Sequence, residues 1–144
     1  MMNEGHAIQR NQSVFVAMPF APEFENVFDF GIRLPLEVCG YEPVRTDKQF
    51  FTGLIVEEIK KRISESSFII ADISTSNANV LFELGYAAGS NKPSVIICRK
   101  GEELPFDVAG MNIISYDPLF IRELKGTMEQ MLITMAEIVA QSEG

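Results

Sequence analysis

The segment FIIADISTSNANVLFELG, residues 68–85, decides the fold that we expect for the whole chain. It opens with four apolar residues, which predict a buried strand, and Asp72 follows them directly. A run of small polar residues comes next, and the apolar positions around Glu83 then predict a helix at residues 79–90. Two carboxylates therefore flank a polar loop at the carboxyl end of a strand, which is the edge where open α/β sheets bind ligands.

Apolar runs elsewhere predict four more strands, separated by segments with helical spacing or by loops. The strands are expected at residues 13–20, 41–45, 94–99 and 111–116, and the other helices at residues 24–39, 54–63 and from Pro118 onward. Strands that alternate with helices indicate a parallel sheet with right-handed crossovers. We predict an α/β, flavodoxin-like (Rossmann-like) three-layer fold with a five-stranded parallel sheet of order 2-1-3-4-5. Residues 1–12 are expected to be a flexible tail and residues 13–142 a single domain.

Local signals refine three of the predicted helices. Pro35 should kink or restart the helix at residues 24–39. Asn79 is expected to cap the helix that carries Glu83, which would make Glu83 its fourth residue. Helical spacing gives the last helix an inward face that consists of Leu124, Met128, Met131, Leu132, Met135 and Ile138.

Charge and cysteine content exclude several classes of function. The net charge is -8 and no basic run is present, which argues against binding to nucleic acid or to an anionic membrane. The N-terminus has no apolar signal segment and no apolar run reaches membrane-spanning length, so a cytoplasmic location is expected. Two cysteines, Cys39 and Cys98, are expected to be buried free thiols, and with one histidine they predict no metal site.

Familiar phosphate-binding motifs are absent from the sequence. No GxGxxG follows a predicted strand, and no GxxxxGK[ST] occurs. A phosphoacceptor receiver would fit Asp72, but it also requires acids after the first strand and a lysine after the last, and this sequence has neither at those positions.

The predicted strand order brings two loops together. The loop after the first strand, which consists of Ala17, Met18, Pro19 and Phe20, is expected beside the loop that follows Asp72. We predict one crevice between these two loops, with no metal and no bound cofactor.

Glu83 is the strongest candidate for chemistry. Its neighbours in the sequence are apolar, so its carboxyl should be partly buried and its pKa perturbed. The alternative is an acid that merely favours the helix dipole. Asp72 is the second catalytic candidate, against the alternative of an aspartate that orders its own loop.

The remaining candidates are polar groups at the same edge of the sheet. Arg45 and Asp47 follow the second strand, where Arg45 could contact an anion or the two could form a solvated surface pair. Ser74, Asn77 and Asn79 could hold a sugar hydroxyl or a phosphate near the helix N-terminus, and a role in turns and caps remains open beside it. Asp107, in LPFDVAG, is expected to order a loop at this edge.

At these residues the sequence resembles the nucleoside 2-deoxyribosyltransferase-like superfamily, and more closely its TIR-like nucleotide-binding branch. The phrases VFVAMPF, RTD, ADISTSNANVLFELGYAAGSNKP and LPFD carry the resemblance. It implies a flavodoxin-like fold and a ligand that contains a ribosyl group. By resemblance, Glu83 is the glutamate that attacks the anomeric carbon, Asp72 holds or protonates the nucleobase, and residues 17–20 line the pocket.

The function implied is cleavage of an N-glycosidic bond in a nucleoside, nucleotide or NAD-like substrate through a glutamate nucleophile. TIR-domain NAD hydrolases likewise use a helix glutamate. The chain departs from the transferases because SNANVLF stands where they usually carry an acid-glycine phrase such as DEGT. The alternative is therefore a non-catalytic nucleotide-binding or signalling module of the TIR-like type. Relatives also imply a homo-oligomer, a dimer or larger.

Overall fold

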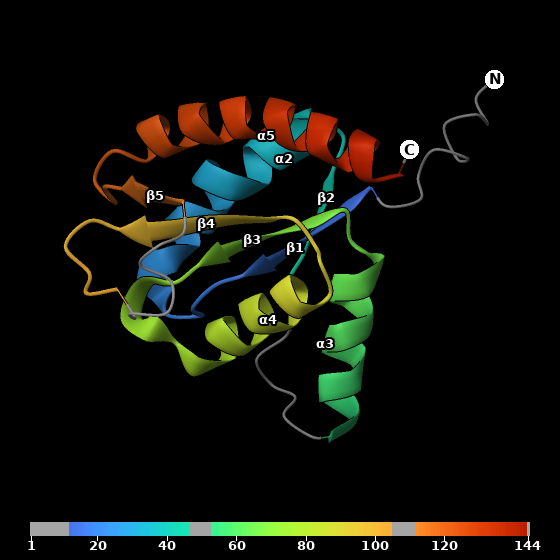
Figure 1. The fold of residues 1–144 in the computed structure, drawn as a ribbon. Coiled ribbons are helices and arrows are strands. Elements are labelled where there is room, and N and C mark those ends of the chain that lie inside the picture. The colour runs from blue at the N-terminus through green and yellow to red at the C-terminus, as the bar shows by residue number, and fades with distance from the viewer. Residues whose placement is uncertain (1–11, 47–52, 105–111, 144) are drawn as a thin grey trace.

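The computed structural model describes residues 12–46, 53–104 and 112–143, and these form one parallel sheet with helices on both faces (Figure 1). The strands are β1 (Ser13–Ala17), β2 (Glu42–Val44), β3 (Phe68–Asp72), β4 (Ser94–Arg99) and β5 (Ile113–Tyr116). They pair in the order β2-β1-β3-β4-β5, every pair parallel. The predicted flavodoxin-like fold and its strand order are confirmed.

Two helical layers cover the sheet. One consists of a short 3₁₀ turn η1 (Pro22–Phe24), a π-helix η2 (Val27–Arg33), α2 (Leu34–Val38) and α5 (Ile121–Glu143). The other consists of α3 (Gly53–Glu65) and α4 (Ala78–Gly89), and a second 3₁₀ turn, η3 (Ser74–Ser76), leads into α4. Figure 1 shows α2 and α5 on the face opposite α3 and α4. None of the described helices is long and apolar enough to cross a membrane.

Side chains that alternate along each strand pack into two hydrophobic cores, one on each face of the sheet. Val14 and Val16 of β1 pack toward η2, α2 and α5, while Phe15 and Ala17 pack toward α3 and α4. All five residues of β3 are buried, as expected for a central strand that is covered on both faces. The sheet is therefore a rigid platform for the loops that leave its carboxyl edge.

Pro35 does interrupt the first helical segment, as predicted. The π-helix η2 runs directly into α2, and Pro35 stands in the first positions of α2. A wider helical turn before a proline relieves the clash between its ring and a preceding carbonyl. Gly31 also lets η2 approach α5 closely, since a Cβ there would lie 2.7 Å from Cδ2 of Leu124.

Several local predictions were wrong. Asn77, not Asn79, caps α4, so Glu83 is the sixth residue of that helix. Ile138 is 39% exposed, and Val139 packs against the core in its place. Cys39 is exposed, whereas Cys98 is buried as expected.

Candidate functional site

The candidate site lies at the carboxyl edge of β1 and β3. Ala17 pairs with Ala71, so the chain leaves both strands at the same level of the sheet. Ala17 and Met18 are 2% and 3% exposed and Pro19 is also buried, whereas Phe20 is partly exposed. The strand order that placed these two loops at neighbouring strand ends is confirmed, and Phe20 is the member of its loop that reaches the surface.

Glu83 is buried in α4, as its apolar neighbours predict. The residue is 6% exposed, between the buried side chains of Val80 and Leu84 on the same helix. Burial raises the pKa of the Glu83 carboxyl to about 7, because ionisation is disfavoured away from water. The Thr46 side chain is close enough to hydrogen-bond this carboxyl, and this contact lowers the pKa in part. Glu83 is thus poised to change its charge near neutral pH.

Asp72 is fully buried at the end of β3, and both of its oxygens accept hydrogen bonds. The backbone N–H of Ser74 donates to Oδ1 at 2.9 Å, and the Tyr116 hydroxyl donates to Oδ2 at 2.5 Å. Burial raises the pKa of Asp72, and these hydrogen bonds partly offset that rise. Burial and the adjacent carboxyl raise the pKa of Tyr116 as well. In this arrangement Asp72 orders the loop after β3 and ties it to β5.

Two polar side chains of that loop, Ser74 and Asn77, accept hydrogen bonds from the protein backbone. Ser74 is fully buried, and its hydroxyl accepts the backbone N–H of Arg99 at 2.8 Å. The Asn77 side-chain oxygen accepts the backbone N–H of Asn79 at 2.9 Å and that of Val80 at 3.2 Å. The Asn79 side chain is exposed. The loop itself is strained, because Thr75 and Ser76 have φ angles of 66° and 49°, which non-glycine residues rarely adopt.

The Arg45 side chain is partly buried and packs against two aromatic rings. Its guanidinium carbon lies 4.9 Å from the ring centre of Phe20 and 4.6 Å from that of Phe28, in the range of cation–π contacts. Burial lowers the pKa of Arg45, while the nearby carboxylates of Glu25 and Asp29 raise it. Asp47 and Asp107 lie outside the described residues.

Arg99 is a residue of this edge that sequence reasoning missed. It stands at the end of β4, where its guanidinium bonds Glu23 at 2.7 Å and Glu102 at 2.5 Å. Glu102 also accepts the backbone N–H of Thr75 at 3.1 Å. One arginine therefore joins the segments that follow β1, β3 and β4. Its single signal in the sequence is a basic residue at a strand end, and its partners are 76 and 3 residues away.

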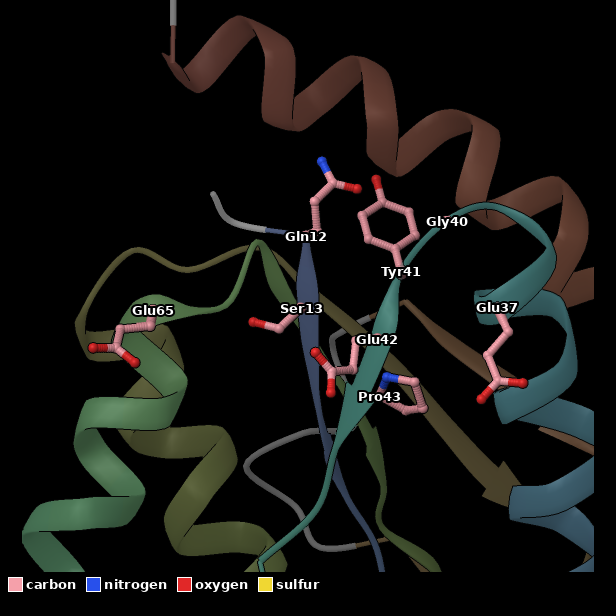
Figure 2. Close-up of a pocket in the computed structure, with 8 residues that line it drawn as sticks. All are labelled: Gln12, Ser13, Glu37, Gly40, Tyr41, Glu42, Pro43 and Glu65. Atoms are coloured by element: carbon pink, nitrogen blue, oxygen red, sulfur yellow. The ribbon is translucent and has the colours of Figure 1, made fainter. Parts of the chain in front are cut away.

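A hollow of about 590 Å³ lies elsewhere, at the amino ends of β1 and β2 (Figure 2). Its acidic residues are Glu37, Glu42 and Glu65. Figure 2 shows their carboxylates spread around the hollow rather than converging on one point. Within the described ranges no group of three or more metal-ligating side chains could hold a metal ion. The hollow has none of the candidate site residues, so we do not regard it as the functional site.

Comparisons with known proteins agree with the fold and indicate the family to which the chain is similar. A family model described as "CAP12/Pycsar effector protein, TIR domain" matches residues 31–118. The TIR domain of the Toll-related receptor TRR-2 from Hydra magnipapillata has a similar structure, with a TM-score of 0.64 and 17% identity over 85% of this chain and 97% of that one. A search of curated proteins found no match.

Two further solved structures are similar at low identity. The lysine decarboxylase LdcF from Francisella novicida matches with a TM-score of 0.53 and 12% identity, over 87% of this chain but 18% of its own. The TIR domains of the activated Roq1 resistosome, which recognises the pathogen effector XopQ, match with a TM-score of 0.49 and 18% identity, over 90% of this chain and 81% of theirs. At these identities the structural likeness shows the fold alone.

Proposed function

Because the chain belongs to the TIR domain family of CAP12/Pycsar effector proteins, we propose that it cleaves the N-glycosidic bond of a nucleoside, nucleotide or NAD-like molecule, with Glu83 as nucleophile. The family match confirms the TIR-like part of the resemblance, and membership of the wider nucleoside 2-deoxyribosyltransferase-like group stays a prediction. The observation that carries the proposal is the setting of Glu83: a buried carboxyl in α4, with a pKa of about 7, in contact with Thr46 beyond β2.

The chemistry follows from the charge that develops on the sugar. As the bond between C1′ and the base nitrogen breaks, its electron pair goes to the base and positive charge grows on the ribosyl ring. A carboxylate beneath C1′ stabilises that charge or closes on it to form an ester, which water then hydrolyses. Low polarity around Glu83 strengthens this electrostatic interaction. Thr46 would orient the carboxylate.

The arrangement of Asp72 bears on the choice of substrate. A neutral nucleoside base leaves as an anion unless an acid protonates it, and Asp72 was the predicted acid. Its oxygens are instead occupied by Ser74 and Tyr116. A pyridinium base, as in an NAD-like molecule, leaves as a neutral molecule and needs no proton. We therefore favour an NAD-like substrate, with Asp72 as a positioning residue for the loop after β3.

The test is turnover by the purified chain with a panel of nucleosides, nucleoside monophosphates and NAD, read by chromatography of the released base. We expect Glu83→Ala to lower the rate by about 10³-fold or more, as for removal of other nucleophiles. The rate of the unmodified chain should rise with pH through about 7, because the carboxylate form of Glu83 reacts. Glu103→Gln, at an exposed glutamate, is the matched control. Turnover that persists in Glu83→Ala would overturn the proposal.

A non-catalytic nucleotide-binding or signalling module is the second candidate. The burial of Asp72 and Ser74 favours it, because two of the predicted site residues are committed to the protein's own structure. This candidate predicts that nucleotides raise the unfolding temperature while no base is released. By resemblance we also propose a cytoplasmic homo-oligomer, a dimer or larger, which light scattering after size-exclusion chromatography would detect.

A further inference from the structure

The side chain of Arg45 has two buried donors that nothing in the described structure satisfies. They are Nε and Nη2, and within the described ranges they are the buried side-chain polar atoms found without a hydrogen-bond partner. Buried polar groups are nearly always hydrogen-bonded, and an unpaired donor of a charged group is especially unfavourable. Such an exception calls for a missing partner.

Together the two nitrogens form one hydrogen-bonding edge of the guanidinium. Nε–H and one N–H of Nη2 lie on the same edge of the planar guanidinium and point in parallel, which is the fork that binds two oxygens of a phosphate or a carboxylate. Phe20 and Phe28 hold the guanidinium in place from β1's exit and from η2. The fork is thus preorganised, because the rings of Phe20 and Phe28 restrict the Arg45 side chain before any ligand binds.

The position of Arg45 connects it to the candidate site. Arg45 directly follows β2, and the next residue, Thr46, contacts the Glu83 carboxyl. Arg45 contacts Phe28, which packs on the core beneath η2, α2 and α5, whereas α4 covers the opposite face. Arg45 and Glu83 therefore belong to opposite faces of the sheet, beside the chain that leaves β2. A ligand that contacts both residues would have to lie across this edge, with its ribosyl group at Glu83 and another group at Arg45.

The local charges decide what substituent the fork accepts. Burial lowers the pKa of Arg45, and the carboxylates of Glu25 and Asp29 act against that shift. Asp29 already pairs with Arg33 at 3.5 Å, and no described carboxylate forms an ion pair with Arg45. The Nε–Nη2 edge of Arg45 therefore has no carboxylate partner among the described residues. We propose that the Nε–Nη2 edge of Arg45 binds a phosphate group of the ligand, so that the site selects a nucleotide over the corresponding nucleoside; this rests on the proposed function.

The experiment compares the binding of adenosine with AMP and of nicotinamide riboside with its 5′-monophosphate, beside inorganic phosphate and pyrophosphate, by calorimetry and by thermal shift. Titrations use the full chain and its Glu83→Gln variant, in which turnover cannot consume the ligand. We expect AMP to bind about tenfold more tightly than adenosine, as charge-assisted bidentate contacts favour. Arg45→Met, which keeps an apolar side chain of similar length but has no donors, should bring that ratio close to one. Arg45→Lys keeps the charge but loses the fork, and should give an intermediate ratio.

Two further variants sharpen the result. Glu25→Gln removes a competing negative charge, so it should tighten the binding of AMP and leave that of adenosine unchanged. Lys125→Met removes a cation of α5 that already pairs with Glu129 at 3.0 Å, and should leave the AMP-to-adenosine ratio unaltered. A preference for AMP that survives Arg45→Met and Arg45→Lys would overturn the proposal, as would equal binding of AMP and adenosine or the absence of any binding. Phosphate-dependent binding without release of base would support the phosphate site and would contradict the proposed N-glycosidase activity.

Discussion

The Glu83 carboxyl lies among apolar side chains of α4, so its ionised form is less stable in the folded protein than in the unfolded chain. The folded pKa is about 7, against an ordinary value of 4.5. Between these two values the folded state binds the proton more tightly. The free energy of unfolding should therefore fall as pH rises from about 4.5 to 7, by a total of about 3 kcal/mol for a shift of this size.

Replacing Glu83 by glutamine should remove this pH dependence. We expect Glu83→Gln to be similar to the unmodified chain in stability at pH 4.5 and to be more stable by about 3 kcal/mol at pH 8. Urea unfolding at both pH values measures the difference, with Glu103→Gln as a control for losing an exposed carboxylate. If Glu83→Gln changes stability equally at pH 4.5 and pH 8, Glu83 does not titrate in this window.

At the scale of the element, α4 carries Glu83, and its N-terminus depends on Asn77. The Asn77 oxygen satisfies two backbone N–H groups of the first turn. We expect Asn77→Ala to lower the free energy of unfolding by about 1 kcal/mol, Asn77→Asp to restore it, and Asn79→Ala to have an effect within about 0.5 kcal/mol. Chemical denaturation of the three variants measures these values. A loss in Asn79→Ala that matched the loss in Asn77→Ala would contradict the assigned cap.

The elements themselves could be predicted from the sequence because each has a strong local signal. A continuous apolar run specifies β3, and helical spacing specifies α4. Asn91, just past the end of α4, has a φ of 60°, a conformation that asparagine adopts more readily than most residues. Boundaries were less accurate where two residues compete for one role, as Asn77 and Asn79 do at the cap. The π-helix η2 was not predicted, since it depends on how Pro35 and the close contact between Gly31 and α5 are accommodated in three dimensions.

At the scale of the whole molecule, the strand order brings segments together that lie far apart in the sequence. The burial of Glu83 was predictable from its neighbours, and the confirmed order places Met18 beside Asp72. The sequence did not predict that the Tyr116 hydroxyl would donate a hydrogen bond to Asp72, or that Phe20 and Phe28 would pack against Arg45. These contacts join segments that are distant in the sequence. Side-chain partners of this kind depend on packing that no local pattern encodes.

The Arg99 interactions connect three loops of the candidate site across the whole carboxyl edge. Glu102 binds both Arg99 and the backbone of the strained residue Thr75, and Glu23 adds the segment after β1. We expect Arg99→Gln to speed hydrogen exchange at the amides of Thr75 and Phe24 by about three- to tenfold, the range for the loss of partly exposed charge-assisted bonds. Amides of β3 should be unaffected, because their partners lie within the sheet.

Hydrogen exchange with residue-level fragmentation measures these rates in the intact chain. Arg33→Gln is the matched control, since Arg33 also bonds two carboxylates, Asp29 and Glu37, but all three lie within one helical segment. It should leave Thr75 and Phe24 unchanged. If Arg99→Gln accelerates exchange in β3 as much as at Thr75, Arg99 supports global stability rather than the loops. If Thr75 exchanges at its original rate in Arg99→Gln, the strained loop is held by Asp72 and Ser74 alone.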